Sequence, residues 1–316
     1  MPQDASPAPG PLRYRGRFAP SPTGPLHFGS LVAAVGSFLD ARHHIGSWLV
    51  RMEDLDRARE VPGAADAILR TLEAFGLHWD GPVVFQSTRT GAYAEALDRL
   101  RSLGLIYPCN CSRRQVAALG RTGPEGPIYP GTCRAGLAPG HSARSLRLLV
   151  PPGLVSFLDR IQGHLEQDIA AEVGDFVLRR ADRVHAYQLA VVVDDAWQGI
   201  TNVVRGADLT ASTPRQILLQ RALGLATPAY AHLPLVLDAR GRKLSKSDAA
   251  APVDPADPLP AVLLALRHLG QPVPPEPAAD VAELWRWAIP AWDIRRVPKN
   301  AAQALAGTPS PADARR

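Results

Sequence analysis

The sequence predicts a parallel α/β fold of the kind that binds nucleotides, with a small inserted module and a short helical C-terminal tail. Three observations predict this fold. The chain opens with a strand, a tight turn, a helix and a second buried strand. A Cys-, Gly- and Pro-rich segment with little periodicity interrupts this pattern from residue 107. Apolar stretches and a helical pattern then resume, which is typical of a sheet that is completed after an insertion.

The individual elements follow from local patterns. We expect a strand at 13–19, a Pro-Ser-Pro-Thr-Gly turn at 20–24, and a helix from about 29 to 44. Apolar runs predict further strands at 48–52, 189–193, 203–204 and 235–237. Helical periodicity predicts further helices at 62–75, 92–103 and 213–223.

This order of elements divides the chain into six segments. Disordered tails are expected at 1–12 and 307–316. The α/β domain occupies 13–106 and 145–251, and the inserted module at 107–144 divides it into halves. A linker followed by the helical tail fills 252–306.

The composition is that of a globular chain, with 46% hydrophobic and 21% charged residues. We see no secretory signal, and the longest apolar stretches are too short to span a membrane, so we expect a soluble, cytoplasmic protein. The net charge of +5 is compatible with a polyanionic partner. Of the 35 basic residues only three are lysines, and two of them, Lys243 and Lys246, lie in one five-residue stretch. An ammonium differs chemically from a guanidinium, so this stretch is expected to need lysine.

The turn before the first helix is the first candidate site. It places His27 just before a helix N-terminus and Gly29 two residues later. Free N–H groups at a helix start suit a phosphate, and a glycine lets a flat base approach the backbone. The alternative is a proline-stiffened turn in which His27 only caps the helix. The second candidate site is the lysine stretch itself, whose two ammoniums on a loop can neutralise a triphosphate. Its alternative is a solvated basic loop.

Together these two stretches carry a family resemblance. His27-Phe28-Gly29-Ser30 resembles the HIGH motif, and the Lys-Leu-Ser-Lys-Ser stretch at 243–247 resembles the KMSKS motif, of class I aminoacyl-tRNA synthetases. The neighbouring segments 17–24 and 51–56 are similar to those of glutamyl-tRNA synthetases, and the likeness extends from about 14 to 247. It implies a Rossmann-like catalytic domain that binds ATP with Mg²⁺. The ATP-binding residues would be His27, Gly29, Lys243 and Lys246, with His27 and Lys246 catalytic.

The same resemblance implies a glutamate site. Glutamate carries two carboxylates and one ammonium, so its pocket should offer two cations and one anion. Bidentate guanidinium contacts suit the carboxylates, and a carboxylate suits the ammonium. The resemblance places Arg17, Arg205, Glu53, Ser21 and Tyr187 in this site. As alternatives, Arg205 could pair with Asp208, and Tyr187 could belong to the core.

All three cysteines fall in the inserted module, as Cys109, Cys111 and Cys133. An odd number in a cytosolic chain argues against disulfides, and the spacing suggests a structural zinc site that lacks one of four ligands. His141 is the ordinary chemical choice for the fourth ligand, whereas the resemblance implies Tyr129. The alternative is three free core thiols.

Only 69 residues follow Ser247, which we take as too few for the anticodon-binding region of a glutamyl-tRNA synthetase. With the cysteine pattern, this resembles the glutamyl-queuosine tRNA(Asp) synthetases. The resemblance implies activation of L-glutamate without tRNA, then transfer to the queuosine base at the wobble position of tRNA(Asp). The anticodon stem–loop would be the partner of a monomer. Two alternatives remain: a discriminating glutamyl-tRNA synthetase that charges a tRNA 3′ end, and a non-catalytic synthetase-like RNA-binding protein.

Overall fold

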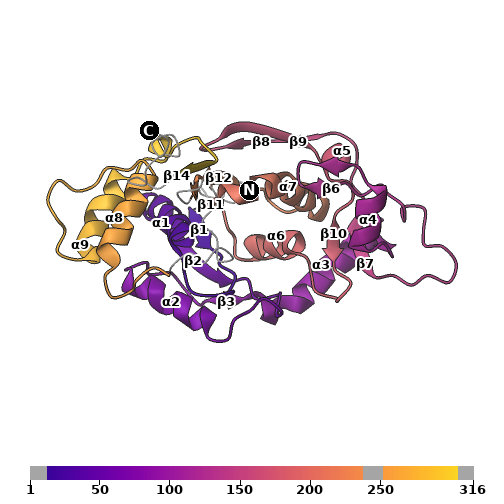
Figure 1. Cartoon of the computed structure of the whole chain (residues 1–316), viewed down its shortest axis with the longest axis horizontal. Helices are drawn as coiled ribbons and strands as arrows, with labels where there is room; N and C mark the ends of the chain where they lie inside the picture. The colour runs from indigo at the N-terminus through magenta and orange to yellow at the C-terminus, as the bar shows by residue number, and fades with distance from the viewer. Residues whose placement is uncertain (1–12, 238–251, 305–316) are drawn as a thin grey trace, which may run out of the picture.

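In the computed structural model, which describes residues 13–237 and 252–304, parallel strands form the centre of the molecule (Figure 1). Strands β1 (Arg15–Phe18), β2 (Ser47–Met52) and β3 (Val84–Phe85) pair in parallel in that order. Strands β11 (Asn202–Gly206), β12 (Ala229–Leu233) and β8 (Leu154–Asp159) also pair in parallel. The N–H of Thr201 donates to the carbonyl of Arg15 over 3.0 Å, so β11 lies beside β1. The predicted parallel α/β fold is confirmed.

Antiparallel pairs extend this framework on the side of the inserted module. Strand β9 (Gly163–Asp168) pairs with β8, and β7 (Ser145–Leu148) pairs with both β4 (Ile106–Cys109) and β10 (Val177–Arg179). The module itself holds β5 (Thr122–Gly123) and β6 (Gly126–Pro127). Near the C-terminus, β13 (Leu235–Leu237) pairs in parallel with β14 (Ala302–Ala304).

Helices pack on the sheet, and the buried hydrophobic residues form two main cores. The first core gathers around helix α1 (Phe28–His43), which contacts β1, β2 and β11. The second lies around α3 (Thr90–Ser102), α6 (Tyr187–Trp197) and α7 (Thr213–Leu223). The remaining helices are α2 (Ala64–Ala74), α4 (Arg113–Leu119), α5 (Ile169–Glu172), α8 (Pro258–His268) and α9 (Val281–Ala291). Among the described residues, none of the helices has both the length and the apolarity needed to cross a membrane.

The strand expected at 189–193 is wrong, because this segment lies inside helix α6. The run Leu-Ala-Val-Val-Val is continuously apolar and ends in three β-branched valines, and such a run fits a buried strand or a buried helix equally well. Leu189, Ala190, Val191 and Val192 are all buried in the second core, so burial removed the periodicity that would have marked a helix.

The helices that follow residue 252 pack into the first core. Helices α8 and α9 both lie against α1 (Figure 1). The indole N–H of Trp285 donates to the carbonyl of Phe75 over 2.9 Å, and that of Trp292 donates to Asp40 over 3.1 Å. This C-terminal segment therefore helps to hold the helix whose N-terminus faces the candidate site.

Candidate active site

A cavity of about 510 Å³ opens at the carboxyl ends of β1, β11 and β12. In a parallel α/β sheet this edge is where ligands bind. The residues predicted to bind ATP or glutamate that the structure describes all line this one cavity: Arg17, Ser21, His27, Gly29, Glu53, Tyr187 and Arg205. The other two residues predicted to bind ATP, Lys243 and Lys246, lie outside the described residues. Residues from distant parts of the chain are thus brought together where a substrate could touch all of them.

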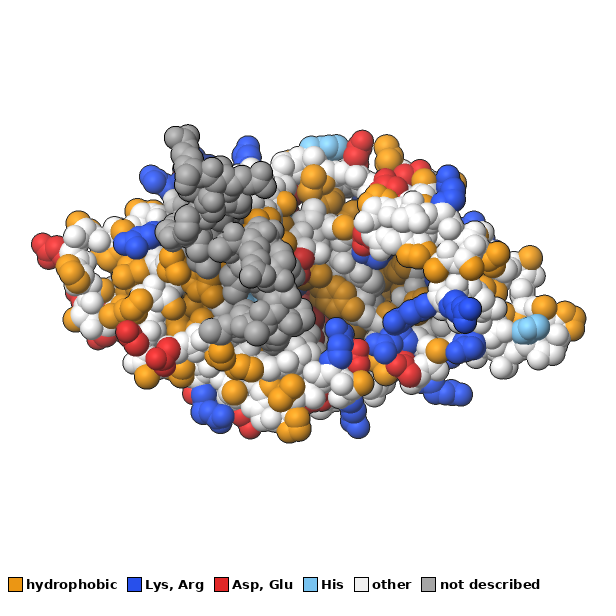
Figure 2. Space-filling model, viewed as in Figure 1, with side chains coloured by type: hydrophobic (Ala, Val, Ile, Leu, Met, Phe, Trp, Pro, Cys, Tyr) orange, Lys and Arg blue, Asp and Glu red, His pale blue; other side chains and the backbone are white. Residues whose placement is uncertain are grey.

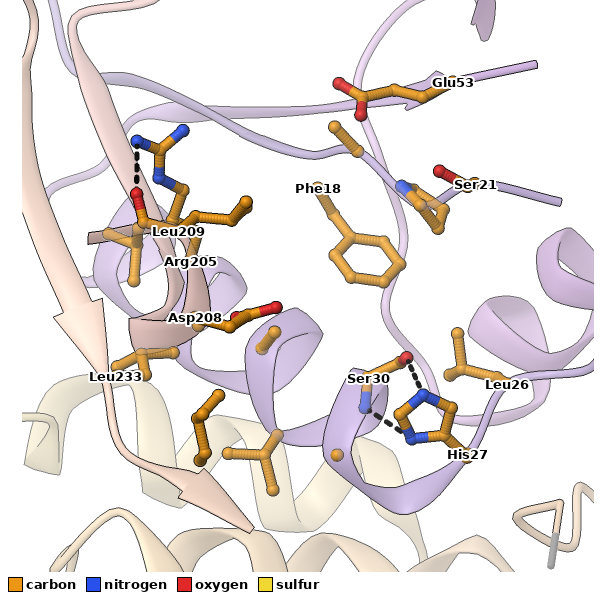
Figure 3. A pocket seen from close by; sticks show the side chains of 18 of the residues that line it. Phe18, Ser21, Leu26, His27, Ser30, Glu53, Arg205, Asp208, Leu209 and Leu233 are labelled. Atoms are coloured by element: carbon orange, nitrogen blue, oxygen red, sulfur yellow. Dashed lines mark hydrogen bonds between the residues drawn. The ribbon is translucent and has the colours of Figure 1, made fainter. Parts of the chain in front are cut away.

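His27 caps helix α1 at one end of the cavity. Its Nδ1 accepts a hydrogen bond from the backbone N–H of Ser30 over 3.3 Å, and its Nε2 lies 3.0 Å from the Ser30 hydroxyl (Figure 3). Gly29 lines the same wall, where it presents no side chain to the cavity. The helix start and its N–H groups therefore face a space that could hold an anion.

Glu53 lies at the other end, beyond Phe18 in Figure 3, among other buried charges. The Arg17 guanidinium donates from Nε to Asp195 over 3.1 Å, and Arg51 donates to the same carboxylate over 2.8 Å. Arg51 also lies 3.4 Å from Glu53. Arg17 uses its Nε–Nη2 side for Asp195 and also lines the cavity.

The surroundings of Glu53 disfavour its ionised form. Burial raises the pKa of its carboxyl above the usual value, although Arg51 and Arg17 oppose that shift. By contrast, burial also opposes ionisation of Asp195, but there Arg17 and Arg51 outweigh it and lower the pKa. Glu53 is consequently the carboxylate here that would gain most from a cationic ligand.

Arg205, at the end of β11, is buried and held on several sides. Its Nε donates to His232 over 3.1 Å and its Nη2 donates to the Thr213 hydroxyl over 2.7 Å. Its Nη1 lies 3.4 Å from the Tyr187 hydroxyl, and both side chains line the cavity. Tyr187 begins helix α6 and is half-buried at the cavity wall, so it is placed to offer its hydroxyl to a ligand.

The three cysteines form a cluster in the inserted module. The sulfurs of Cys109, Cys111 and Cys133 lie within 4.8 Å of one another, close enough to hold a metal ion. The Tyr129 hydroxyl lies 3.4 Å from the Cys109 sulfur and 3.9 Å from that of Cys111. His141 is exposed and is not among the residues of this cluster.

The donor set fits a zinc ion. Burial opposes ionisation of Cys109, but hydrogen bonds from Tyr129 and from Arg147 Nε, at 3.2 Å, lower its pKa to about 7. A thiolate is the form that binds a metal, and three thiolates with one oxygen satisfy a tetrahedral ion. Bound there, the ion would cross-link β4 to the loop that carries Tyr129 and Cys133.

Sequence reasoning missed the buried partners of the predicted residues. Asp195, Arg51, His232, Thr213 and Asp159 escaped notice, although each lies within one contact of a site residue or its partner. A signal existed for some of them. An arginine within a strand expected to be buried, and two adjacent aspartates after an apolar run, both require charged partners.

Comparisons with known proteins agree with this geometry. Residues 13–270 match the family model of the class I tRNA synthetases (E and Q), catalytic domain. A glutamate tRNA ligase of Elizabethkingia meningosepticum, solved in complex with its amino acid, superimposes with a TM-score of 0.77 at 25% identity. That match covers 93% of this chain and 67% of the ligase. Fold and site thus define a class I synthetase catalytic domain.

Two relatives narrow the family further. The glutamyl-Q tRNA(Asp) synthetase of Dechloromonas aromatica is 59% identical over 91% of this chain and 96% of its own length. That of Chromobacterium violaceum is 54% identical over 92% of this chain and 97% of its own. The chain belongs to the glutamyl-Q tRNA(Asp) synthetase family of class I synthetase-like ligases.

Proposed function

We propose that this protein uses ATP to activate L-glutamate without any tRNA, and then transfers glutamate to the queuosine base at the wobble position of tRNA(Asp). The single observation that carries the proposal is the division of charge in the cavity. The guanidiniums of Arg17 and Arg205 and the carboxylate of Glu53 lie toward one end, and the N-terminus of α1 with His27 lies at the other. Arg59 and Asp208 also line the cavity. A dicarboxylic amino acid and a phosphate chain are complementary to these two ends.

The amino-acid end supplies contacts for each charged group of glutamate. Arg17 and Arg205 bind the two carboxylates, and the Tyr187 hydroxyl supports Arg205. Glu53 binds the ammonium, which replaces in part the hydration that burial removed. Ser21 lies at the edge of this pocket near Glu53 (Figure 3). These contacts hold the reacting carboxylate still and lower the entropy cost of the reaction.

In the first step, an oxygen of the glutamate α-carboxylate attacks the α-phosphorus of ATP, and pyrophosphate leaves with its electron pair. His27 and the α1 N-terminus stabilise negative charge on the phosphates, and Lys246 follows the charge as it moves to the leaving group. Mg²⁺ would arrive with ATP and neutralise phosphate charge. In the second step, a queuosine hydroxyl attacks the activated carbonyl and AMP leaves.

The inserted module and the elements beside it serve the RNA. A structural zinc ion would be held in the module by Cys109, Cys111, Tyr129 and Cys133. Such an ion would stabilise the fold of the module. Lys and Arg side chains gather on the face of the molecule around α3, β10 and β7 (Figure 2). Such a surface suits the phosphates of a stem–loop.

The test is glutamate-dependent ATP–pyrophosphate exchange in the absence of tRNA. We expect exchange with glutamate and little with glutamine, because a pocket built for a carboxylate leaves buried charge unpaired when an amide enters. Aspartate is too short to reach both arginines. His27→Ala should lower the exchange rate by about a hundredfold, the scale of losing one charge partner in the transition state. Exchange that requires tRNA would favour a conventional glutamyl-tRNA synthetase, and no exchange at all would favour a non-catalytic RNA-binding protein.

A further inference from the structure

We propose that Asp159 and His232 form a buried positioning pair, which fixes the guanidinium of Arg205 in the orientation that binds a glutamate carboxylate. This inference rests on the proposed function, because it takes Arg205 to be a glutamate-binding residue. Neither residue lines the cavity, so each would act on the substrate only through Arg205.

The three side chains form a continuous chain of short contacts. Asp159 Oδ2 lies 2.6 Å from His232 Nδ1, and His232 Nε2 lies 3.1 Å from Arg205 Nε. His232 is completely buried, while Asp159 and Arg205 are 2% and 5% exposed. Strand register creates the arrangement, since Arg205 on β11 lies opposite His232 on β12, and Asp159 ends the adjacent strand β8.

Only one protonation state of the imidazole fits these contacts. The Nε of arginine can only donate a hydrogen bond, so Nε2 of His232 must accept. Nδ1 therefore carries the proton and donates it to Asp159. Burial lowers the pKa of His232, which keeps the ring neutral. A carboxylate that fixes both the tautomer and the orientation of an imidazole is a familiar device of enzyme active sites.

Asp159 is itself fixed by the backbone. Its Oδ1 accepts the N–H groups of Ile161 and Gln162, both at 2.9 Å, and that of His232 at 3.2 Å. One oxygen of the carboxylate is therefore held by the backbone, and the other is aimed at the imidazole. The backbone of the loop after β8 thus holds Asp159, and through it His232 and Arg205, in place.

This arrangement determines which part of Arg205 reaches the substrate. Nε is held by His232 and Nη2 by Thr213, at 2.7 Å. Nη1, beside the Tyr187 hydroxyl, is left toward the cavity. If the acceptor at Nε were lost, a buried N–H would be unpaired and the guanidinium would rotate to satisfy it.

Two substitutions of His232 separate this role from a structural one. The amide oxygen of glutamine can occupy the position of Nε2 and accept from Arg205, whereas asparagine reaches only the position of Nδ1 and preserves the contact with Asp159. We expect His232→Asn to raise the KM for glutamate at least tenfold, with the KM for ATP changed less than twofold. His232→Gln should raise the glutamate KM less than threefold, even if it lowers the melting temperature as much as His232→Asn does.

Asp159→Asn provides an independent arm. The three backbone N–H groups require an oxygen at the Oδ1 position, so the new amide nitrogen must face His232 and donate to Nδ1. The imidazole is then forced into the tautomer whose Nε2–H opposes Arg205. The glutamate KM should rise about tenfold in this variant. In the His232→Gln background, Asp159→Asn should raise the glutamate KM little further, because glutamine has no imidazole whose tautomer could change.

The outcomes distinguish this inference from the proposed function. A wild-type protein that shows no glutamate-dependent exchange would remove the proposed function and this inference with it. If the wild type is active and Arg205→Lys impairs glutamate use, but His232→Asn and His232→Gln raise the KM equally, only the positioning pair is refuted. A rise in the ATP KM equal to that for glutamate would also refute it.

Discussion

At the scale of single residues, Glu53 of the proposed glutamate site is held at the expense of stability. Burial raises the pKa of this carboxyl, so the folded state disfavours its ionised form relative to the unfolded chain. The penalty is present when the pH is above the unfolded pKa. It disappears as the pH falls below that value, because the carboxyl is then protonated in both states.

This sign gives a prediction for Glu53→Gln. The variant should melt roughly 2 °C above the wild type at pH 7, the size expected for about 1 kcal/mol in a chain of this length. The difference should shrink as the pH falls toward 4. Its glutamate KM should rise at least tenfold, since the ammonium has lost its partner. Calorimetry at several pH values and exchange kinetics measure the two effects. A variant that is less stable at pH 7 would show that the contact with Arg51 outweighs the burial of Glu53.

Ile45 is a second residue under strain, far from the cavity. It follows the end of α1 with φ of 53°, a left-handed conformation that a β-branched residue rarely adopts. Its side chain is 95% exposed and therefore contributes little packing. The N–H of Gly46 donates to the carbonyl of Ala41, as in a helix end that normally carries glycine at the position of Ile45.

We expect Ile45→Gly to stabilise the protein by about 0.5–1 kcal/mol, since glycine adopts this conformation without strain but loses more chain entropy on folding. Ile45→Ala, which keeps a Cβ atom, should gain less and serves as the matched control. Denaturant unfolding measures both. A loss of stability in Ile45→Gly would mean that the exposed side chain has a packing role.

At the scale of elements, patterns in the sequence located strands β1, β2 and β11 and helix α1, but missed strand β12 and failed where burial hides the pattern. Helix α7 is found at 213–223 as expected, because it combines a proline in its first turn with a glycine just after its end. Helix α6 was missed because its apolar face extends around the helix. The family resemblance predicted Arg17, Glu53 and Arg205, which line the cavity, but not Arg59 and Asp208, which also line it. The buried partners of the predicted residues, such as Asp195, are joined to them by contacts between residues far apart in the chain, which no local pattern encodes.

The cysteine cluster gives the prediction that belongs to this scale. The purified protein should contain about one zinc ion per chain, and Cys133→Ser should lose it. His141→Ala should retain the metal, because His141 is exposed and outside the cluster. The zinc content of the wild type and of both variants is measured by mass spectrometry after dialysis against a weak chelator. If His141→Ala loses zinc while Tyr129→Phe keeps it, the module rearranges around the metal and Tyr129 is not the ligand.

At the scale of the whole molecule, two hydrophobic cores make up the body of the protein. The cavity draws its walls from elements of both: α1 and β1 belong to the first, and Tyr187 of α6 packs against the second. A glutamate ligase of known structure shares this body, but a third of that ligase has no counterpart here.

The last prediction concerns the nucleic acid that enters the cavity. If the anticodon is the substrate, a short stem–loop places queuosine at the activated glutamate, and no contact with the distant acceptor end is needed. An isolated tRNA(Asp) anticodon stem–loop bearing queuosine should then accept labelled glutamate, whereas the same stem–loop with guanosine should not. Phosphate contacts weaken as salt rises, so acceptance should fall between 50 and about 200 mM salt. The fall should be modest, because a net charge of +5 neutralises few phosphates. Periodate oxidation of the 3′-terminal ribose of full-length tRNA, with the queuosine diol protected, should leave acceptance intact. Loss of acceptance under those conditions would identify an ordinary acceptor-end synthetase and refute the anticodon as the substrate.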